Sequence, residues 1–130
     1  MNMKDERQFV GYSKYRSRLV DGHVHTELCP HGSGDRTAMM IEKAIELRIE
    51  KVCLTEHAPL PIAFAAEYGG DKKAYDTASL KLNEVDTYLE LGRQLQRAYG
   101  THIDISLGFE VDYIPGFESD IQEFLDRYGP

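Results

Sequence analysis

The 130-residue sequence predicts an α/β domain built on a parallel β-sheet. Three segments, at residues 18–25, 51–57 and 103–111, alternate between apolar and polar side chains, as strands with one covered face do. Apolar residues at helical spacing follow each segment. Strands that alternate with helices indicate parallel pairing, in a sheet that is either open or closed into a barrel. In both architectures functional residues lie at the carboxyl ends of the strands.

The first strand is expected over residues 18–25. One of its faces carries Leu19, Asp21, His23 and His25. A loop rich in Gly, Ser and Asp follows this strand. The first helix is predicted to begin at an N-cap, either Asp35 or Thr37, and to continue to about Leu47.

The second strand is expected over residues 51–57. One of its faces carries Cys53, Thr55 and His57. The stretch 58–77 is long for a connection, and loops of that length are often functional lids, so we interpret it as a lid-like loop. A helix is predicted from about residue 78 to 99, where Gly100 suits the C-terminal stop.

The third strand, at residues 103–111, alternates most cleanly, and Glu110 lies on its polar face. A last helix is indicated by apolar residues at helical spacing. These are Ile121, Phe124, Leu125 and Tyr128. Residues 1–17 are polar and mixed in charge, and we interpret them as a lead-in to a folded part at 18–130.

Composition narrows the classes of partner. The net charge of −7 argues against a nucleic-acid-binding surface, which would need a basic patch. It does not argue against a small anionic substrate, because bound metals can reverse the local field. No apolar run is long enough to span a membrane, and the N-terminus lacks the apolar core of a signal peptide. Two cysteines are too few for a disulfide scaffold, which favours a reduced, cytoplasmic setting.

Metal-ligating side chains gather at the predicted strand ends. His23 and His25 end the first strand, His57 ends the second and Glu110 ends the third, while His31 follows in the first loop. Imidazoles and a carboxylate that converge in a cleft can bind a divalent metal and ionise its water.

Each residue alone also has an ordinary interpretation. With five histidines, chance predicts about 0.2 His-x-His pairs in a chain of this length, so such a pair is weak evidence by itself. Glu56 points to the face opposite His57, and we assign it no direct role. Asp21 could orient an imidazole or be a plain strand-end charge. Cys29 and Cys53 could bind metal, although small buried residues are the commoner role.

Taken together, four motifs in this order resemble the PHP family, named for polymerase and histidinol phosphatase. The motifs are Asp21-Gly22-His23-Val24-His25-Thr26, Cys29-Pro30-His31-Gly32, Thr55-Glu56-His57-Ala58-Pro59 and Leu107-Gly108-Phe109-Glu110-Val111-Asp112-Tyr113. The resemblance covers nearly the whole chain, and the wording is most similar to the histidinol-phosphatase branch.

The resemblance implies a distorted seven-stranded β/α barrel of the TIM type with up to three divalent metals, zinc, manganese or iron. It implies that His23, His25 and Glu110 hold the first metal and that His31 and His57 hold the second. It also implies that Glu110 bridges to the third. The implied reaction is hydrolysis of L-histidinol phosphate, with His23, His25, His57 and Glu110 as the catalytic set and no covalent enzyme nucleophile.

The chain departs from the family pattern because it stops after the third strand–helix unit, and three strands cannot close a barrel. We therefore expect the N-terminal part of a PHP-type domain whose C-terminal part is absent. A half-barrel that completes itself by association is the alternative. Other functions remain open at this point: a PHP-type phosphoesterase acting on nucleotides, or an inactive half-barrel fragment.

Overall fold

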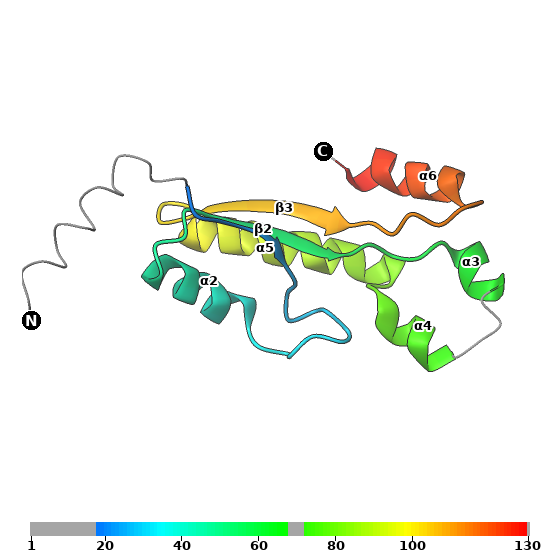
Figure 1. Ribbon diagram of the computed structural model, residues 1–130, viewed down its shortest axis with the longest axis horizontal. Coiled ribbons are helices and arrows are strands. Elements are labelled where there is room, and N and C mark those ends of the chain that lie inside the picture. The colour runs from blue at the N-terminus through cyan, green and yellow to red at the C-terminus, as the bar shows by residue number, and fades with distance from the viewer. Residues whose placement is uncertain (1–17, 68–71, 130) are drawn as a thin grey trace, which may run out of the picture.

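The structure, a computed structural model, describes residues 18–67 and 72–129, so the predicted lead-in at 1–17 lies outside the described residues. Its centre is a three-stranded sheet in the order β1-β2-β3. The strands are β1 (Val20–Val24), β2 (Lys51–His57) and β3 (Asp104–Glu110), and both pairings are parallel. The prediction of a parallel α/β fold is confirmed (Figure 1), whereas closure into a seven-stranded barrel stays a prediction.

Strand register decides which residues meet at the end of the sheet. β2 and β3 pair residue for residue, from Lys51 with Asp104 to His57 with Glu110. β1 pairs less regularly, because three steps along β1, from Asp21 to Val24, match only two steps along β2. β1 therefore carries one extra residue, as in a β-bulge.

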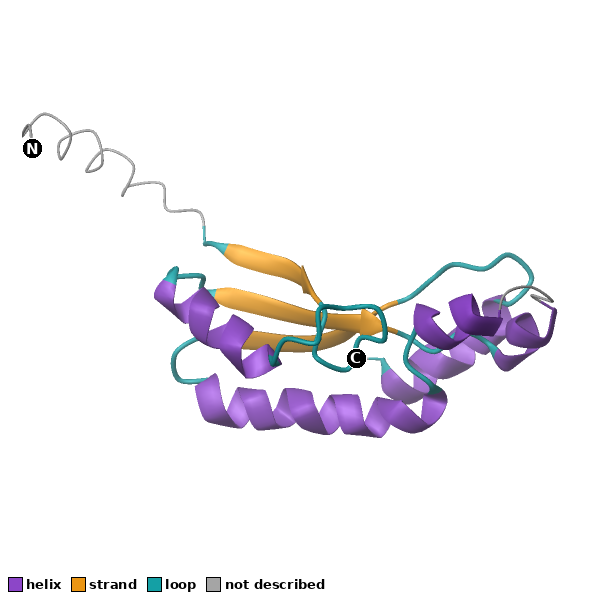
Figure 2. Ribbon diagram, turned by 90° about the horizontal axis from the view of Figure 1, so that it is seen from below, coloured by secondary structure: helices purple, strands orange, loops and turns teal. Residues whose placement is uncertain are grey.

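Helices cover one face of the sheet. α2 (Thr37–Glu46) and α5 (Val85–Tyr99) lie beneath the strands in Figure 2. They bury a core whose members come from both helices, from the strands and from the adjoining segments: Ile41, Ala44, Val52, Leu54, Leu80, Tyr88, Leu95, Ile103 and Ile105. Gly92 lets α5 approach β3 closely, since a Cβ at that position would overlap the Leu107 side chain. The candidate ligands lie on the opposite, polar face of the strands.

The first helix is not capped as predicted. Neither Asp35 nor Thr37 is the N-cap, because Arg36 holds that position and makes no side-chain cap bond. Instead, the carboxylate of Glu27 accepts a 2.7 Å hydrogen bond from the Thr37 backbone N–H, and the Thr37 hydroxyl accepts one from the Glu27 N–H at 3.1 Å. The carboxylate comes from the preceding loop, which spacing within the helix cannot reveal.

The predicted loop at 58–77 was partly wrong, since most of its described part is helical. It contains α3 (Ile62–Glu67) and the beginning of α4 (Lys72–Ala78). The helix predicted at 78–99 begins later, with a 3-10 turn η2 (Leu82–Glu84) leading into α5. Lys81 has an extended backbone there, and its N–H donates to the Glu84 carboxylate at 2.6 Å, which fixes the new start.

The last helix, α6 (Glu118–Tyr128), follows β3 and packs over its carboxyl end. Phe124 of α6 meets Phe109 of β3 edge to face, with ring centroids 5.1 Å apart. Among the described residues no helix has the length and apolar character needed to cross a membrane.

Candidate metal centre

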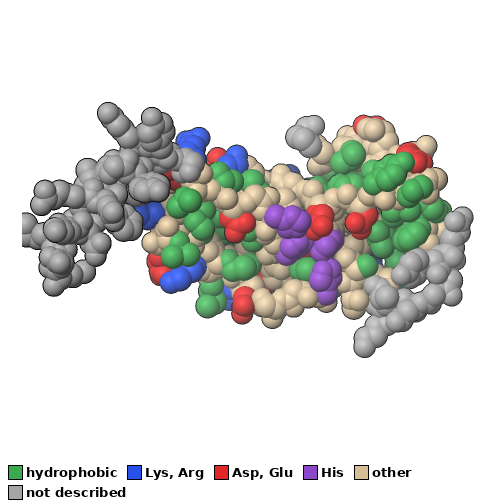
Figure 3. All heavy atoms as spheres, in the orientation of Figure 1, with side chains coloured by type: hydrophobic (Ala, Val, Ile, Leu, Met, Phe, Trp, Pro, Cys, Tyr) green, Lys and Arg blue, Asp and Glu red, His purple; other side chains and the backbone are tan. Residues whose placement is uncertain are grey.

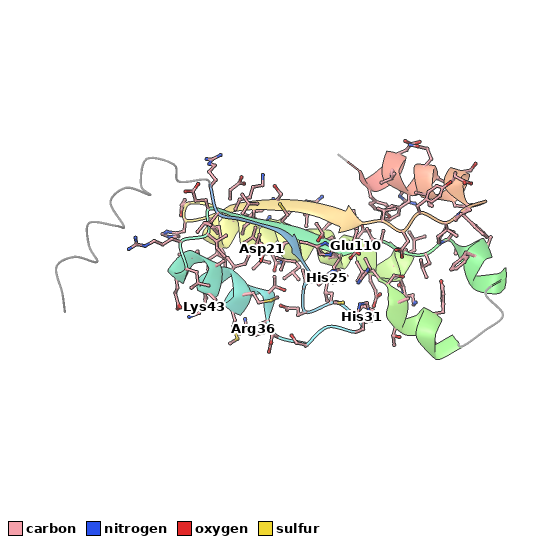
Figure 4. The ribbon with its side chains drawn as sticks, viewed as in Figure 1. Asp21, His25, His31, Arg36, Lys43 and Glu110 are labelled. Carbon is pink, nitrogen blue, oxygen red and sulfur yellow. The ribbon has the colours of Figure 1, made fainter. Side chains whose placement is uncertain are left out.

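Histidine side chains gather around one carboxylate where the strands end. Figure 3 shows them as a single group with an acidic side chain beside it, and Figure 4 places His25, His31 and Glu110 at that end of the sheet. The parallel register explains this placement, because His57 and Glu110 are paired neighbours on β2 and β3. His23 lies on β1 and His25 just beyond it.

The first donor group consists of His23, His25 and Glu110. The Nε2 atoms of the two histidines are 2.9 Å apart, and Oε2 of Glu110 lies 3.0 Å from His23 Nε2 and 3.1 Å from His25 Nε2. Ligand atoms on a tetrahedral zinc ion are about 3.3 Å apart, given metal–nitrogen bonds of about 2.0 Å. Three donors that converge this closely, two imidazoles and a carboxylate, fit a divalent metal.

A second pair of donors lies beside the first group. Nε2 of His57 is 3.0 Å from Nε2 of His31, and Nδ1 of His57 is 3.3 Å from Oε2 of Glu110. His31 Nδ1 lies 2.8 Å from the carbonyl oxygen of Thr77. A carbonyl only accepts hydrogen bonds, so Nδ1 of His31 carries the proton and its Nε2 keeps a free lone pair.

Glu56 is the functional residue that sequence reasoning missed. Its alternation was predicted correctly, since it points into the helix-covered face and is fully buried. Its carboxylate nevertheless reaches the site: Oε2 lies 3.4 Å from His25 Nδ1 and accepts a 3.2 Å hydrogen bond from the His57 backbone N–H. The other oxygen accepts from the Thr26 N–H at 2.5 Å and the Thr26 hydroxyl at 2.8 Å. Glu56 thus orients His25 and leaves its Nε2 facing the other donors.

The contact between Glu56 and His25 could not be predicted from alternation, because it forms just beyond the end of β1. His25 and Thr26 lie beyond the last residue of β1, where the strand's alternation no longer dictates direction. No spacing in the sequence signals this contact, because Glu56 and His25 are 31 positions apart and meet only in the folded chain.

Tyr88 of α5 fixes the ends of β2 and β3 from below. Its hydroxyl donates a 2.7 Å hydrogen bond to the Gly108 carbonyl and accepts one from the Glu56 backbone N–H at 3.4 Å. Burial raises the pKa of Tyr88 to about 12, so the hydroxyl keeps its proton at neutral pH.

Burial also lowers the pKa of His57, against a smaller opposing effect of the Glu110 carboxylate. The neutral imidazole, the form that binds metals, is therefore favoured at this position.

Asp21 does not contact an imidazole in this arrangement. Its Oδ1 lies 3.4 Å from the backbone nitrogen of His23, so the orienting role considered for it is not found among the described residues. Figure 4 shows Asp21 nearer the start of β1, away from His31. The basic side chains of Arg36 and Lys43 belong to the region of α2, apart from the donors.

With this geometry established, comparison with known proteins decides the family. The model of the PHP domain matches residues 21–129. The chain belongs to the PHP family. Enzymes of this family depend on metals, in keeping with the donor groups described above.

Individual relatives carry the histidinol-phosphatase name. The chain is 38% identical over 110 residues to histidinol-phosphatase of Bacillus subtilis, covering 85% of this chain and 39% of that protein. It is 26% identical over 110 residues to a provisionally named histidinol-phosphatase of Deinococcus radiodurans, covering 85% and 38%. A crystal structure from Listeria monocytogenes, provisionally described as a histidinol phosphatase, matches with a TM-score of 0.82 and 41% identity, covering 85% of this chain and 41% of that one. The chain therefore spans about two fifths of the length of these relatives.

Proposed function

We propose that this chain carries metal-binding and catalytic residues of a phosphomonoesterase that hydrolyses L-histidinol phosphate to L-histidinol and phosphate. The observation that carries the proposal is the convergence of His23, His25 and Glu110 within about 3 Å of one another, with His57 against the same carboxylate. The relatives' names supply the substrate, and the donor set suits the chemistry.

We assign the residues as follows. His23, His25 and Glu110 hold one metal, His31 and His57 hold a second, and Glu110 also bridges to a third. Zinc, manganese or iron, up to three ions in all, suits imidazole and carboxylate donors. A divalent metal held here would neutralise phosphate oxygens and acidify a water molecule.

The chain's own groups set up this chemistry before any substrate binds. Glu56 and the Thr77 carbonyl hold protons on the Nδ1 atoms of His25 and His31, so both Nε2 atoms face the site. Glu110 is partly exposed and accepts no hydrogen bond from a backbone N–H among the described residues, which leaves its lone pairs available.

A metal-binding chain without turnover is the second candidate. It is favoured by the size of the first donor group, which contains three residues among those described, whereas a tetrahedral ion takes four ligands. Self-association and a nucleotide substrate stay predictions, as does the cytoplasmic setting inferred from the cysteines.

Phosphate release separates the two candidates. The purified 130-residue chain is incubated with L-histidinol phosphate and Mn²⁺ or Zn²⁺. A second arm adds the part of the Bacillus subtilis enzyme that follows the matched N-terminal 110 residues. We expect release in the second arm at least, abolished by a chelator and by Glu110→Gln. A nucleoside monophosphate serves as the comparison substrate.

Three outcomes are informative. Release that prefers the nucleotide would contradict the proposed substrate. Release that survives Glu110→Gln would contradict the proposed site. Stoichiometric metal binding with no release in either arm would favour the chain that binds metal without turnover.

A further inference from the structure

A second group of donor atoms lies beside the first, and it contains sulfur. One ligand atom from each of His25, Cys29 and His57 lies within 4.8 Å of the other two. The sequence did not distinguish Cys29 from Cys53 as a possible metal ligand, but the structure does. Cys53 belongs to no such group among the described residues, because it lies four positions before His57 on β2, about 13 Å back along the strand.

The thiol of Cys29 is buried and uncommitted. The residue is only 8% exposed and forms no disulfide. Within the described part of the chain its hydrogen bonds involve its backbone and not its sulfur. A buried thiol that faces two imidazoles is a potential ligand, because zinc and related ions bind thiolate and imidazole together.

The turn at residues 29–32 presents this sulfur. The Cys29 N–H donates to the Thr26 carbonyl at 3.1 Å, and the Gly32 N–H donates to the Cys29 carbonyl at 3.2 Å. The same turn carries His31, whose Nε2 lies 3.0 Å from His57. Glycine at 32 leaves room, since a Cβ there would lie 3.1 Å from the Cys29 Cβ and 3.6 Å from its sulfur.

The distances require only a small adjustment. In a tetrahedral zinc site, bonds of about 2.3 Å to sulfur and 2.0 Å to nitrogen place those two ligands about 3.6 Å apart. Because the three ligand atoms lie within 4.8 Å of one another, the sulfur–nitrogen pairs need to close by at most about 1.2 Å and the nitrogen pair by at most about 1.5 Å, within reach of side-chain rotation.

We propose that His25, Cys29 and His57 form a further metal site, which prefers a thiolate-binding divalent ion of the zinc class over manganese. The site differs from the one built on Glu110 in containing sulfur and in excluding His23. The sulfur-containing site shares His25 with the site built on Glu110 and His57 with the pair His31 and His57, so it competes with both for an imidazole.

The sharpest test uses the 130-residue chain with Cys53→Ser, so that Cys29 is the only thiol. The chain is titrated with Co²⁺, and the near-ultraviolet absorption is recorded. A sulfur-to-cobalt charge-transfer band that saturates at one cobalt per chain is expected. Since only Cys29 can supply the sulfur, this result does not depend on whether a Cys29 variant folds.

Matched variants then identify the partners of the sulfur. With Cys53 retained, Cys29→Ser is expected to lose the band. His57→Ala is expected to lose it as well, whereas His23→Ala retains it, because His23 lies outside the sulfur-containing group. Far-ultraviolet circular dichroism checks that each variant is folded.

The proposal is overturned if the Cys53→Ser chain binds no cobalt or binds it without a sulfur band. It is also overturned if the band persists in folded Cys29→Ser. Saturation at half a cobalt per chain would mean that sulfur from two chains is shared, which equally contradicts the site as proposed.

Discussion

Two neighbouring residues of β2, Glu56 and His57, face opposite sides of the sheet, and the two sides use carboxylates differently. On the helix-covered side, Glu56 is fully buried and receives hydrogen bonds from Thr26 and from the His57 backbone. On the uncovered side, the Glu110 side chain is 35% exposed and faces imidazole nitrogens. One carboxylate is committed to holding the structure, while the other keeps lone pairs for a ligand. Conservative replacements at the two positions should therefore fail in different ways.

The largest effect is expected for Glu56→Gln. The amide accepts hydrogen bonds at only one end. Its NH2 group must therefore face either the donors of Thr26 or the backbone N–H of His57, and the pair left without an acceptor costs about 3 kcal/mol in the free energy of unfolding. The matched change Glu110→Gln should cost less than about 1 kcal/mol, because the side chain is partly exposed. Urea denaturation followed by circular dichroism measures both. Equal losses at the two positions would erase the proposed division of roles.

Zinc bound on the uncovered side of the sheet should raise the free energy of unfolding of the chain by nearly as much as Glu56→Gln lowers it. A ligand present at about 100 times its dissociation constant raises the free energy of unfolding by about 2.7 kcal/mol. The thermal midpoint of the chain should rise with added Zn²⁺, and the double variant His23→Ala/His25→Ala should lose most of that rise. His102→Ala is the control, since this exposed histidine lies outside the donor groups. If the thermal midpoint of the double variant rose with Zn²⁺ as much as that of the wild type, the assignment of His23 and His25 as metal ligands would be contradicted.

Tyr88→Phe tests whether hydrogen bonds on the helix-covered side of the sheet help to position the metal ligands on the uncovered side. Removal of the hydroxyl leaves the Gly108 carbonyl and the Glu56 N–H without this partner, at a cost of about 1–2 kcal/mol in stability. Since both groups lie at the ends of β2 and β3, metal affinity should weaken as well. Calorimetric titration with Zn²⁺ measures that affinity. Tyr99→Phe, which removes an exposed bond to Glu42, should leave it unchanged.

The smallest effect concerns pH. Burial holds the pKa of His57 below its usual 6.5, so the unfolded chain takes up a proton there before the folded chain does. In chelator-treated protein this residue contributes stability above about pH 6.5 that is lost as the pH falls below that value. Denaturation midpoints from pH 7.5 to 5.5 in wild type and His57→Gln give the test. A variant whose pH dependence matches wild type would contradict the role of burial.

Local patterns in the sequence predict most of the sheet but little of the connections. The ends of β2 agree with the expected 51–57, because its alternation reports burial directly. Alternation also identifies the faces of Glu110 and His57, and the rule that sites lie at carboxyl strand ends brings them together. The helices within 58–78 were missed because long connections are judged by length and by Gly or Pro content.

Contacts between distant segments were beyond reach. Glu27 caps α2 from ten positions away, and Glu56 contacts His25 across 31 positions. Neither pair has a periodicity, so the pairs emerge only once the chain is folded. The role of Glu56 depended on where β1 stops, and strand ends are the least certain part of such predictions.

The extra residue in β1 makes the length of this strand a functional property. Between Asp21 and Val24 the chain takes three residue steps where β2 takes two. This extra residue determines which way the side chains of His23 and His25 point relative to β2. A Cβ at Gly22 would meet no atom within 4 Å, so other side chains can occupy that position. Deletion of the same residue would remove the bulge and turn neighbouring side chains to the opposite face. At Gly22, therefore, a substitution is tolerated where an insertion or a deletion is not, and we expect relatives to keep the length of β1 more strictly than the residue at this position.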